Sequence, residues 1–151
     1  MGGVRNLSSE NEVLVDGNGK KYIVLTLQNY GVDKYYKISS EMQEVKKKFL
    51  ATVPNLDEMS EYEKVLKILE FMHYIKYGKD ENGRTINDAY TALVKGKATC
   101  TGFAEAFNFL ASCINMESVE IGNPGVHSWN GVKVCGNWFE VEPQQKQSFC
   151  K

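Results

Sequence analysis

Cys100 is the residue of this chain whose position best suits covalent chemistry. It stands where the polar stretch GKAT, residues 96–99, changes into a pattern typical of an amphipathic helix, and among the four cysteines it alone lies at such a junction. The free N–H groups and the macrodipole at a helix start stabilise a thiolate and lower a cysteine pKa from about 8.5. Such a sulfur could attack a carbonyl carbon while the same N–H groups bind the oxyanion. A structural thiol in the core is the alternative that this position alone leaves open.

A predicted β-hairpin near the C-terminus places a histidine and carboxylates on one face. His127 begins HSWNGVKV, and a turn at Cys135 and Gly136 folds WFEVEP back beside it. Two registers remain open, one pairing Glu142 with Trp129 and the other pairing it with His127. Because side chains alternate along a strand, both registers put the same residues on one face: His127, Trp129, Trp138, Glu140 and Glu142. The other face, which we expect to pack on helices, carries Val132, Val134, Phe139 and Val141.

Glu142 is the carboxylate best placed to orient His127, because Glu140 sits farther away on the same face. A carboxylate there could hold Nδ1–H of the imidazole and leave Nε2 facing the sulfur. The predicted catalytic residues are therefore Cys100, His127 and Glu142. An exposed strand histidine and a plain surface glutamate remain the alternatives.

Other aromatic and histidine side chains are further candidates for the site or its walls. We expect Trp129 and Trp138 to form groove walls or packing contacts. Tyr90, ahead of the cysteine in NDAYTAL, could offer a hydroxyl to the site. His73 lies on a mostly apolar helical face, which is typical of a buried or boundary histidine.

The segments that must position these residues read as strands, then helices, then strands. EVLV and KKYIVLTLQ flank the hairpin-turn residues DGNG, and KYYKI, residues 34–38, predicts a third strand. From Ser40 the apolar period becomes helical, with Ser40 and Gln43 as a capping box, and Ser60 and Glu63 predict a second box and helix. This order predicts an α+β fold rather than a βαβ alternation.

We predict a single domain for the whole chain, residues 1–151. A chain of this length can bury one hydrophobic core, and no repeat or linker divides it. We place the N-terminal strands within 12–38, the first helices within 41–76, and the core that carries the candidate site within 86–143. In that core a helix runs from Cys100 to about Asn115.

Composition and charge argue against several kinds of partner. A formal net charge of -1 leaves no basic stripe to neutralise phosphates, so we expect no nucleic-acid partner. We expect no membrane partner either, because no apolar run approaches the roughly 20 residues that span a bilayer. The wide cysteine spacings argue against a zinc site, and the chemistry proposed for Cys100 requires no metal or cofactor. The sequence leaves the oligomeric state and the disulfides open.

Three ordered blocks of this sequence resemble the transglutaminase-like superfamily. GKATCTGFA is similar to the bacterial setting G-x-x-x-C-x-G-[YF]-[AC], HSWN to H-[AS]-W-N, and GNWFEVEP to G-x-W-[YF]-x-V-[DE]-P. The resemblance covers roughly residues 61–143. It implies a papain-like α+β fold, in which a central helix opening at the cysteine packs on an antiparallel sheet, and a Cys-His-Asp triad that acts in acyl transfer. On that resemblance Cys100 is the nucleophile, His127 the base and Glu142 the third member.

Two features depart from the family pattern. The family usually has aspartate at the position of Glu142, and the extra methylene moves the carboxylate by roughly one bond length, although triads elsewhere use either residue. The residues after Pro143 also differ from the Thr-Trp that often follows. We therefore expect a more weakly oriented His127 rather than an inactive site.

The resemblance implies a cysteine acyltransferase or hydrolase that acts on peptide-like amides of a protein or peptide substrate. We expect hydrolysis rather than crosslinking, because nothing here resembles the calcium-binding loops or accessory domains of animal crosslinking enzymes. The alternative, motivated by Glu142, is a catalytically degenerate binding module for a protein or cell-wall partner. We expect a cytoplasmic location if the chain is complete, and a secreted or bacterial cell-surface location if it is a domain of a larger protein.

Overall fold

A computed structural model of the protein describes residues 12–15, 17–19, 21–24, 32–123 and 125–145. Short 3-10 helices, η1 (Leu56–Glu58) and η2 (Met72–Tyr74), flank the second α-helix. The remaining elements, in chain order, are β1 (Glu12–Val15), β2 (Lys21–Val24), α1 (Val32–Ala51), α2 (Glu61–Phe71), β3 (Lys76–Tyr77), α3 (Ala89–Lys95), β4 (Lys97–Ala98), α4 (Cys100–Cys113), β5 (Ser118–Asn123), β6 (His127–Val134) and β7 (Asn137–Val141).

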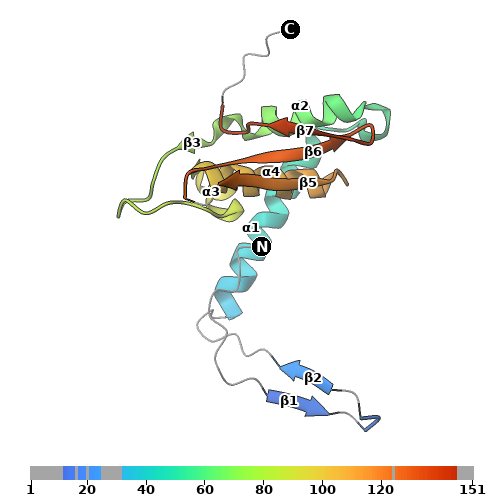
Figure 1. Ribbon diagram of the computed structural model, residues 1–151, viewed down its shortest axis with the longest axis vertical. Helices are drawn as coiled ribbons and strands as arrows, with labels where there is room; N and C mark the ends of the chain where they lie inside the picture. Colours follow the sequence, from blue (N-terminus) through green and yellow to red (C-terminus); the bar gives the residue numbers. More distant parts are fainter. Residues whose placement is uncertain (1–11, 16, 20, 25–31, 124, 146–151) are drawn as a thin grey trace.

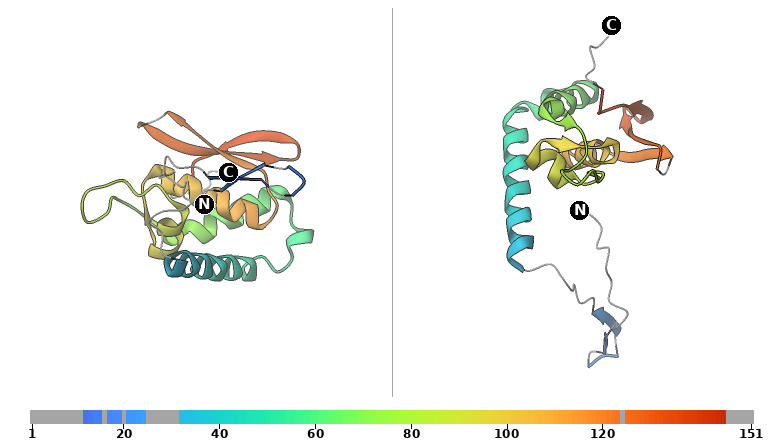
Figure 2. Two further views of the ribbon diagram at one scale, coloured as in Figure 1. Left: turned by 90° about the horizontal axis from the view of Figure 1, so that it is seen from below. Right: turned by 90° about the vertical axis from the view of Figure 1, so that its left-hand side faces the viewer.

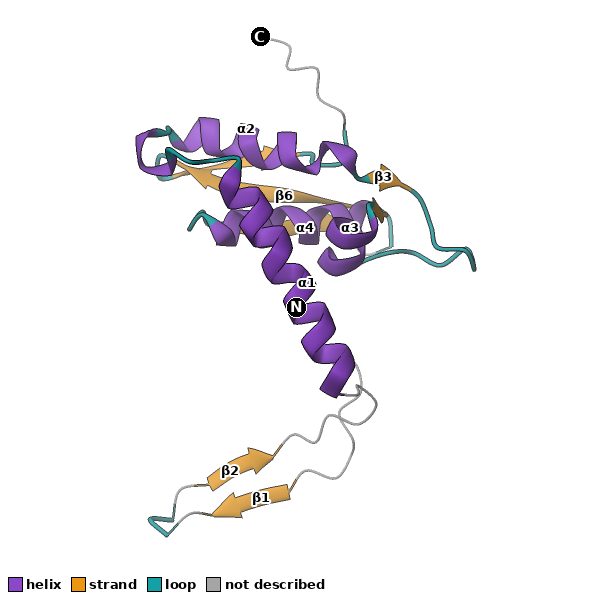
Figure 3. Cartoon of the chain, turned by 180° about the vertical axis from the view of Figure 1, so that it is seen from behind, coloured by secondary structure: helices purple, strands orange, loops and turns teal. Residues whose placement is uncertain are grey.

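The helices and the main sheet are arranged in layers, which confirms the predicted α+β class. The antiparallel sheet β5-β6-β7 lies on one side, α2 and α4 lie against it, and α1 lies on the far side (Figure 1; Figure 2, left). Figure 3, which views the molecule from behind, shows α1 crossing in front of α4, on the side away from the sheet. α4 is therefore enclosed between the sheet and other helices.

The central helix α4 is buried because most of its surface is apolar or small. Its buried residues are Gly102, Phe103, Ala104, Ala106, Phe107, Leu110 and Ala111. Large side chains such as Phe107 and Leu110 are fully buried, and each contributes about 1.5–3 kcal/mol of transfer free energy. A helix fixed in this way gives Cys100, its first residue, a rigid support.

The register of the sheet decides between the two hairpin alternatives. β6 pairs with β7 as Asn130↔Val141 and Val132↔Phe139. Continued by one step, this register places Glu142 opposite Trp129, so Glu142 is one diagonal step from His127.

The face of the hairpin expected to pack on helices is confirmed for three of its four residues. Val132 is fully buried, and Val134 and Val141 are half-buried against the core. Phe139 differs, because it lies on the edge strand β7 and remains 54% exposed.

The third strand predicted at 34–38 is wrong, because α1 already begins at Val32. The capping box predicted at Ser40 is therefore wrong too. The aromatic and β-branched residues of KYYKI suggested a strand, yet Ile38 belongs to the helical stripe of Met42, Val45 and Phe49. The capping box of Ser60 and Glu63 is confirmed at the start of α2.

Two small elements ahead of Cys100 have no counterpart in the prediction. α3 is a short helix capped by Asp88, whose Oδ1 accepts the Thr91 N–H at 2.7 Å, and it ends at Gly96 in the left-handed region. β3 and β4 form a two-residue parallel pair, Lys76↔Lys97 and Tyr77↔Ala98. Elements this short carry too few residues to show a hydrophobic period.

The predicted N-terminal hairpin is present, with β1 and β2 paired from Glu12↔Val24 to Val15↔Lys21. Figure 1 shows it beyond the N-terminal end of α1, apart from the layered part of the molecule. Among the residues that the structure describes, no helix is long and apolar enough to cross a membrane.

Candidate active site

Cys100 is the first residue of α4, as the sequence predicts. The preceding residue, Thr99, is 3% exposed, and its N–H donates to the Ile86 carbonyl oxygen at 3.0 Å. The Thr99 hydroxyl lies 2.8 Å from the same oxygen and 2.8 Å from Asn87 Oδ1. These bonds direct the Thr99 hydroxyl away from α4, where it makes no capping hydrogen bond, so N–H groups of the first turn remain available to the sulfur and to a bound group.

The position of Gly102, two residues after Cys100, has no space for a side chain. A Cβ at Gly102 would lie 2.4 Å from the Ile86 carbonyl oxygen and 2.8 Å from Ala98 Cβ. The first turn of α4 can therefore pack against the Ile86 backbone only without a side chain at this position.

His127, the first residue of β6, is held by a carboxylate and by an aromatic ring. Its Nε2 lies 2.5 Å from Glu142 Oε2, while Glu142 Oε1 accepts the Gln144 N–H at 3.2 Å. The imidazole stacks on Trp129, with ring centroids 5.7 Å apart and an interplanar angle of 23°. The ring is thus fixed at one edge and on one face.

The prediction that Glu142 holds Nδ1 of His127 is wrong, since the contact is made by Nε2. The Cys100 sulfur accepts a hydrogen bond from the Ser128 backbone N–H and also contacts the His127 side chain. The sulfur therefore lies close to the main chain of residues 127–128 and to the imidazole, whose Nε2 is held by Glu142. The structure brings Cys100, His127 and Glu142 together, with Nε2 rather than Nδ1 of the imidazole facing the carboxylate.

Hydrogen bonding favours the charged forms of the cysteine and the histidine. Burial alone raises the pKa of Cys100, but hydrogen bonds from the Ser128 N–H, from His127 and from the Thr101 N–H and hydroxyl together hold it below its usual value. The hydrogen bond to Glu142 raises the pKa of His127, burial opposes it, and contact with Cys100 raises it further. The two shifts favour a thiolate beside an imidazolium.

This pair can reach molecules from solution. Cys100 is half-buried, and the side chains of His127 and Glu142 are 40% and 22% exposed. A thiolate at a helix start, paired with an imidazolium that a carboxylate orients, is an arrangement suited to nucleophilic attack on an acyl group.

A family comparison decides what kind of domain carries this arrangement. The family model of the transglutaminase-like superfamily matches residues 51–143, which is more than half of the chain. This chain belongs to the transglutaminase-like superfamily. The match includes Cys100, His127 and Glu142 and confirms the resemblance seen in the sequence motifs.

Two solved structures share the fold of this superfamily member. A transglutaminase is 15% identical with a TM-score of 0.55, and the match covers 82% of this chain and 36% of that protein. A candidate cysteine protease from Cytophaga hutchinsonii is 14% identical with a TM-score of 0.50, over 90% of this chain and 62% of that protein. This chain therefore spans less than two thirds of the length of either protein. No curated protein matches its sequence significantly.

Asn130, in the superfamily motif HSWN, is a site-supporting residue that the sequence analysis missed. It is fully buried, and its Nδ2 donates to the Ala104 carbonyl oxygen at 3.1 Å and to Asn108 Oδ1 at 3.0 Å. These bonds attach β6 to α4 and so hold His127 beside Cys100. The signal was present in the sequence, because Asn130 alternates onto the same face of the strand as Val132 and Val134, and an asparagine on a buried face needs buried partners.

Thr101 is a second residue that the sequence analysis missed. Its hydroxyl contacts the Cys100 sulfur and lies 3.2 Å from Ser128 Oγ. The side chain next to the cysteine on α4 therefore faces the first residues of β6. Nothing in the sequence indicates this contact, because it depends on how α4 and β6 pack.

The remaining sequence candidates lie elsewhere or form the walls of the site. Tyr90 donates its hydroxyl proton to Glu41 Oε2 at 2.5 Å, so that proton is not directed at Cys100. His73 is exposed rather than buried, and Trp138 is 53% exposed on β7. Trp129 packs on His127, as expected of a packing residue.

The cysteines that the structure describes are Cys100, Cys113 and Cys135, and all three are free thiols. The sequence left two disulfides open. Cys150 lies outside the described residues.

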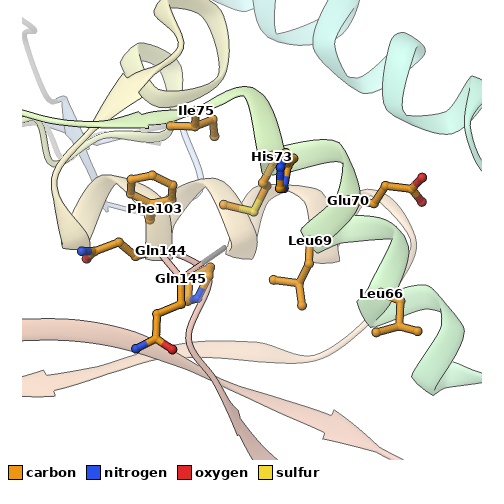
Figure 4. Close-up of a pocket in the computed structure, with 10 residues that line it drawn as sticks. Leu66, Leu69, Glu70, His73, Ile75, Phe103, Gln144 and Gln145 are labelled. Carbon is orange, nitrogen blue, oxygen red and sulfur yellow. The ribbon is translucent and has the colours of Figure 1, made fainter. Parts of the chain in front are cut away.

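A pocket of about 310 Å³ adjoins the segment that carries Glu142 (Figure 4). Residues of α2, η2 and α4 line it together with Pro143, Gln144 and Gln145. Cys100, His127 and Glu142 are not among the lining residues, so the pocket is a neighbour of the site rather than its centre.

Proposed function

We propose that this protein is a cysteine hydrolase that cleaves peptide-like amides, with Cys100 as nucleophile, His127 as acid and base, and Glu142 as the residue that orients His127. The observation that carries the proposal is the meeting of thiol, imidazole and carboxylate at the half-exposed start of α4. Membership of the transglutaminase-like superfamily supports thiol-dependent acyl chemistry.

The first half-reaction forms a thioester. The Cys100 thiolate attacks the amide carbonyl carbon, a C–S bond forms, and the carbonyl electrons move to oxygen, where free N–H groups of the first turn of α4 can bind the oxyanion. The C–N bond then breaks, and the His127 imidazolium gives its proton to the departing nitrogen. An amine leaves, and His127 becomes neutral.

The second half-reaction releases the acid. Neutral His127 takes a proton from a water molecule whose oxygen bonds to the acyl carbon. The C–S bond breaks, so a carboxylic acid leaves and the thiolate and imidazolium are restored. Glu142 stabilises the imidazolium that is present at the start of the cycle and again at its end.

Exposure of the site supports water as the acceptor. The His127 side chain is 40% exposed, so water reaches the base directly. An enzyme that favours an amine acceptor must limit that access, because water is present at far higher concentration.

The test is to incubate the protein with a mixture of peptides, with and without a small primary amine, and to analyse the products by mass spectrometry. We expect products that have gained water from the wild type and from Cys113→Ser, and none from Cys100→Ser. Predominant amine adducts would identify a transamidase instead. Equal turnover by Cys100→Ser would refute the assignment of the nucleophile.

The binding-module alternative predicts a different outcome. It requires no product with any peptide, normal reactivity of Cys100, and unchanged partner binding by Cys100→Ala. The contact between Glu142 and His127 weakens its original motivation, because the longer side chain still reaches the imidazole.

A further inference from the structure

We propose that the pocket beside Glu142 receives one apolar side chain of a peptide substrate, and that the Gln144 side chain binds the adjacent substrate backbone N–H. This inference rests on the proposed function, because it names the substrate feature that the same site would select. The pocket residues come from α2, η2, α4 and the segment after β7.

The pocket is linked to the candidate site through two of its walls. Phe103 lies on α4 one turn after Cys100, and Gln144 follows Glu142, whose Oε1 accepts the Gln144 N–H at 3.2 Å. Figure 4 shows Phe103 and Gln144 together at one end of the pocket, with Leu66 and Glu70 toward the other. A peptide bound at Cys100 can therefore extend into the end formed by Phe103 and Gln144.

The lining of the pocket favours an uncharged, apolar occupant. Its floor consists of Met72, Ile75 and Phe103, which are 2%, 5% and 3% exposed. Leu66 and Leu69 form a half-buried wall, as Figure 4 shows. A volume of about 310 Å³ lies at the lower end of the range for ligand pockets, which suits one large side chain better than a whole cofactor.

The Gln144 side chain indicates that the occupant carries a hydrogen-bond donor. Its Oε1 is buried and has no hydrogen-bond partner among the residues that the structure describes. Unpaired buried acceptors are rare and unfavourable in folded proteins. A backbone N–H next to the apolar side chain would supply the missing donor, and a plain hydrocarbon chain would not.

Acidic side chains should be disfavoured at this position. The carboxylate of Glu70 lies at the solvent side of the pocket, with its side chain 69% exposed. That carboxylate is already paired with Lys67 Nζ at 2.7 Å, so dehydration is what disfavours an acidic occupant: an aspartate would lose its hydration in the apolar interior and find no lysine or arginine among the described residues that line the pocket.

The test uses thiol-reactive tripeptides that carry a chloromethyl ketone in place of the scissile amide. One probe contains three glycines, three probes carry a single leucine at each position in turn, and three carry aspartate. The rate of Cys100 alkylation by each probe is measured by mass spectrometry. We expect one leucine probe to react roughly tenfold or more faster than the triglycine probe, and its aspartate counterpart to show no gain.

Variants connect that preference to the pocket. Leu66→Trp fills the pocket and should reduce the leucine-to-glycine rate ratio toward one, whereas Tyr62→Trp, on the same helix but outside the pocket, should preserve it. Leu66→Ala enlarges the pocket and should shift the preference from the best leucine probe to an additional probe that carries tryptophan at the same position, which tests the pocket if Leu66→Trp does not fold. Gln144→Met should slow every peptide probe relative to iodoacetamide, which has no backbone to bind.

The outcomes separate this inference from the proposed function. If iodoacetamide labels Cys100 no faster than Cys113, the proposed function fails, and the inference fails with it. If Cys100 is activated but every peptide probe reacts at the same rate, or Leu66→Trp keeps the leucine preference, only the pocket assignment is overturned.

Discussion

At the residue scale, the state of Cys100 depends on which atoms surround its sulfur and its histidine partner. Glu142 contacts Nε2 of His127 and binds the Gln144 N–H with its second oxygen, so both carboxylate oxygens are engaged. The sequence suggested that the longer side chain would weaken this contact. A distance of 2.5 Å shows that glutamate reaches the imidazole.

Glu142→Gln should lower the pKa of His127, because the hydrogen bond to the carboxylate is the largest influence that raises it. The imidazolium fraction at a given pH then falls, so the alkaline limb of any pH–rate profile, where His127 loses its proton, moves to lower pH. NMR titration of the His127 ring measures the shift, with His73, the other histidine, as internal reference. Glu140→Gln, on the same sheet face, is the matched control. An identical His127 titration in all three proteins would contradict the role given to Glu142.

Thr101→Val should raise the pKa of Cys100, because the threonine hydroxyl is one of the groups that lower it. Ser128→Ala should have a smaller effect, since Ser128 contributes its backbone N–H, which the variant keeps. The pH dependence of Cys100 alkylation by iodoacetamide, mapped by mass spectrometry, reports the pKa of Cys100 in both variants. A larger shift in Ser128→Ala than in Thr101→Val would show that the serine hydroxyl, not the threonine, contacts the sulfur.

At the element scale, the site depends on how β6 and the first turn of α4 are attached to each other. Asn130→Ala removes a fully buried amide together with the hydrogen bonds that its Nδ2 donates to Ala104, Asn108 and Val119. We expect the free energy of unfolding to fall by about 1–3 kcal/mol in urea titrations. Asn123→Ala, on the exposed neighbouring strand, should stay within about 0.5 kcal/mol of wild type. Equal losses in the two variants would argue against Asn130 as the link between β6 and α4.

Gly102→Ala tests the packing of the first turn of α4. Alanine gains about 1 kcal/mol of helix propensity over glycine, but its Cβ would lie 2.4 Å from a backbone oxygen, and overpacking of this kind costs about 1–3 kcal/mol. We expect net destabilisation in thermal unfolding and slower alkylation of Cys100. Gly17→Ala, where an added Cβ meets nothing within 4 Å, is the control. A Gly102→Ala variant as stable as wild type would show that the first turn can shift without loss.

Sequence periodicity predicted the long elements of the layered part better than the short ones. Apolar residues recur at helical spacing from Phe103 onward often enough to identify α4. The alternation of inward- and outward-facing residues in HSWNGVKV identifies β6 in the same way. The seven residues of α3 repeat too few times to be read in this way. The prediction for the N-terminal part of α1 is wrong because Tyr35 and Tyr36 favour strands. Both side chains are more than half exposed, and this part of the helix continues the apolar C-terminal part of α1.

At the scale of the whole molecule, the layered arrangement brings together residues that lie far apart in the chain. α4 is enclosed between the sheet and the other helices, so its first residue, Cys100, is held in place. His127, at the start of β6, and Glu142, directly after β7, lie next to it. The sequence identified Cys100 by its place at a helix start. It identified His127 and Glu142 by their residue types and by the face of the hairpin that they share. The choice of imidazole nitrogen, the Thr101 contact and the pocket beside Glu142 could not be predicted, because they depend on the packing of separate elements.

The most direct test of the central claim, that His127 holds Cys100 as a reactive thiolate, is the pH dependence of alkylation by iodoacetamide, mapped to each cysteine by mass spectrometry. The account predicts that Cys100 reacts at lower pH than Cys113, whose pKa is raised by burial, and that His127→Ala moves the Cys100 midpoint upward while His73→Ala does not. One pH dependence shared by Cys100 and Cys113, or a Cys100 midpoint unchanged in His127→Ala, would contradict it.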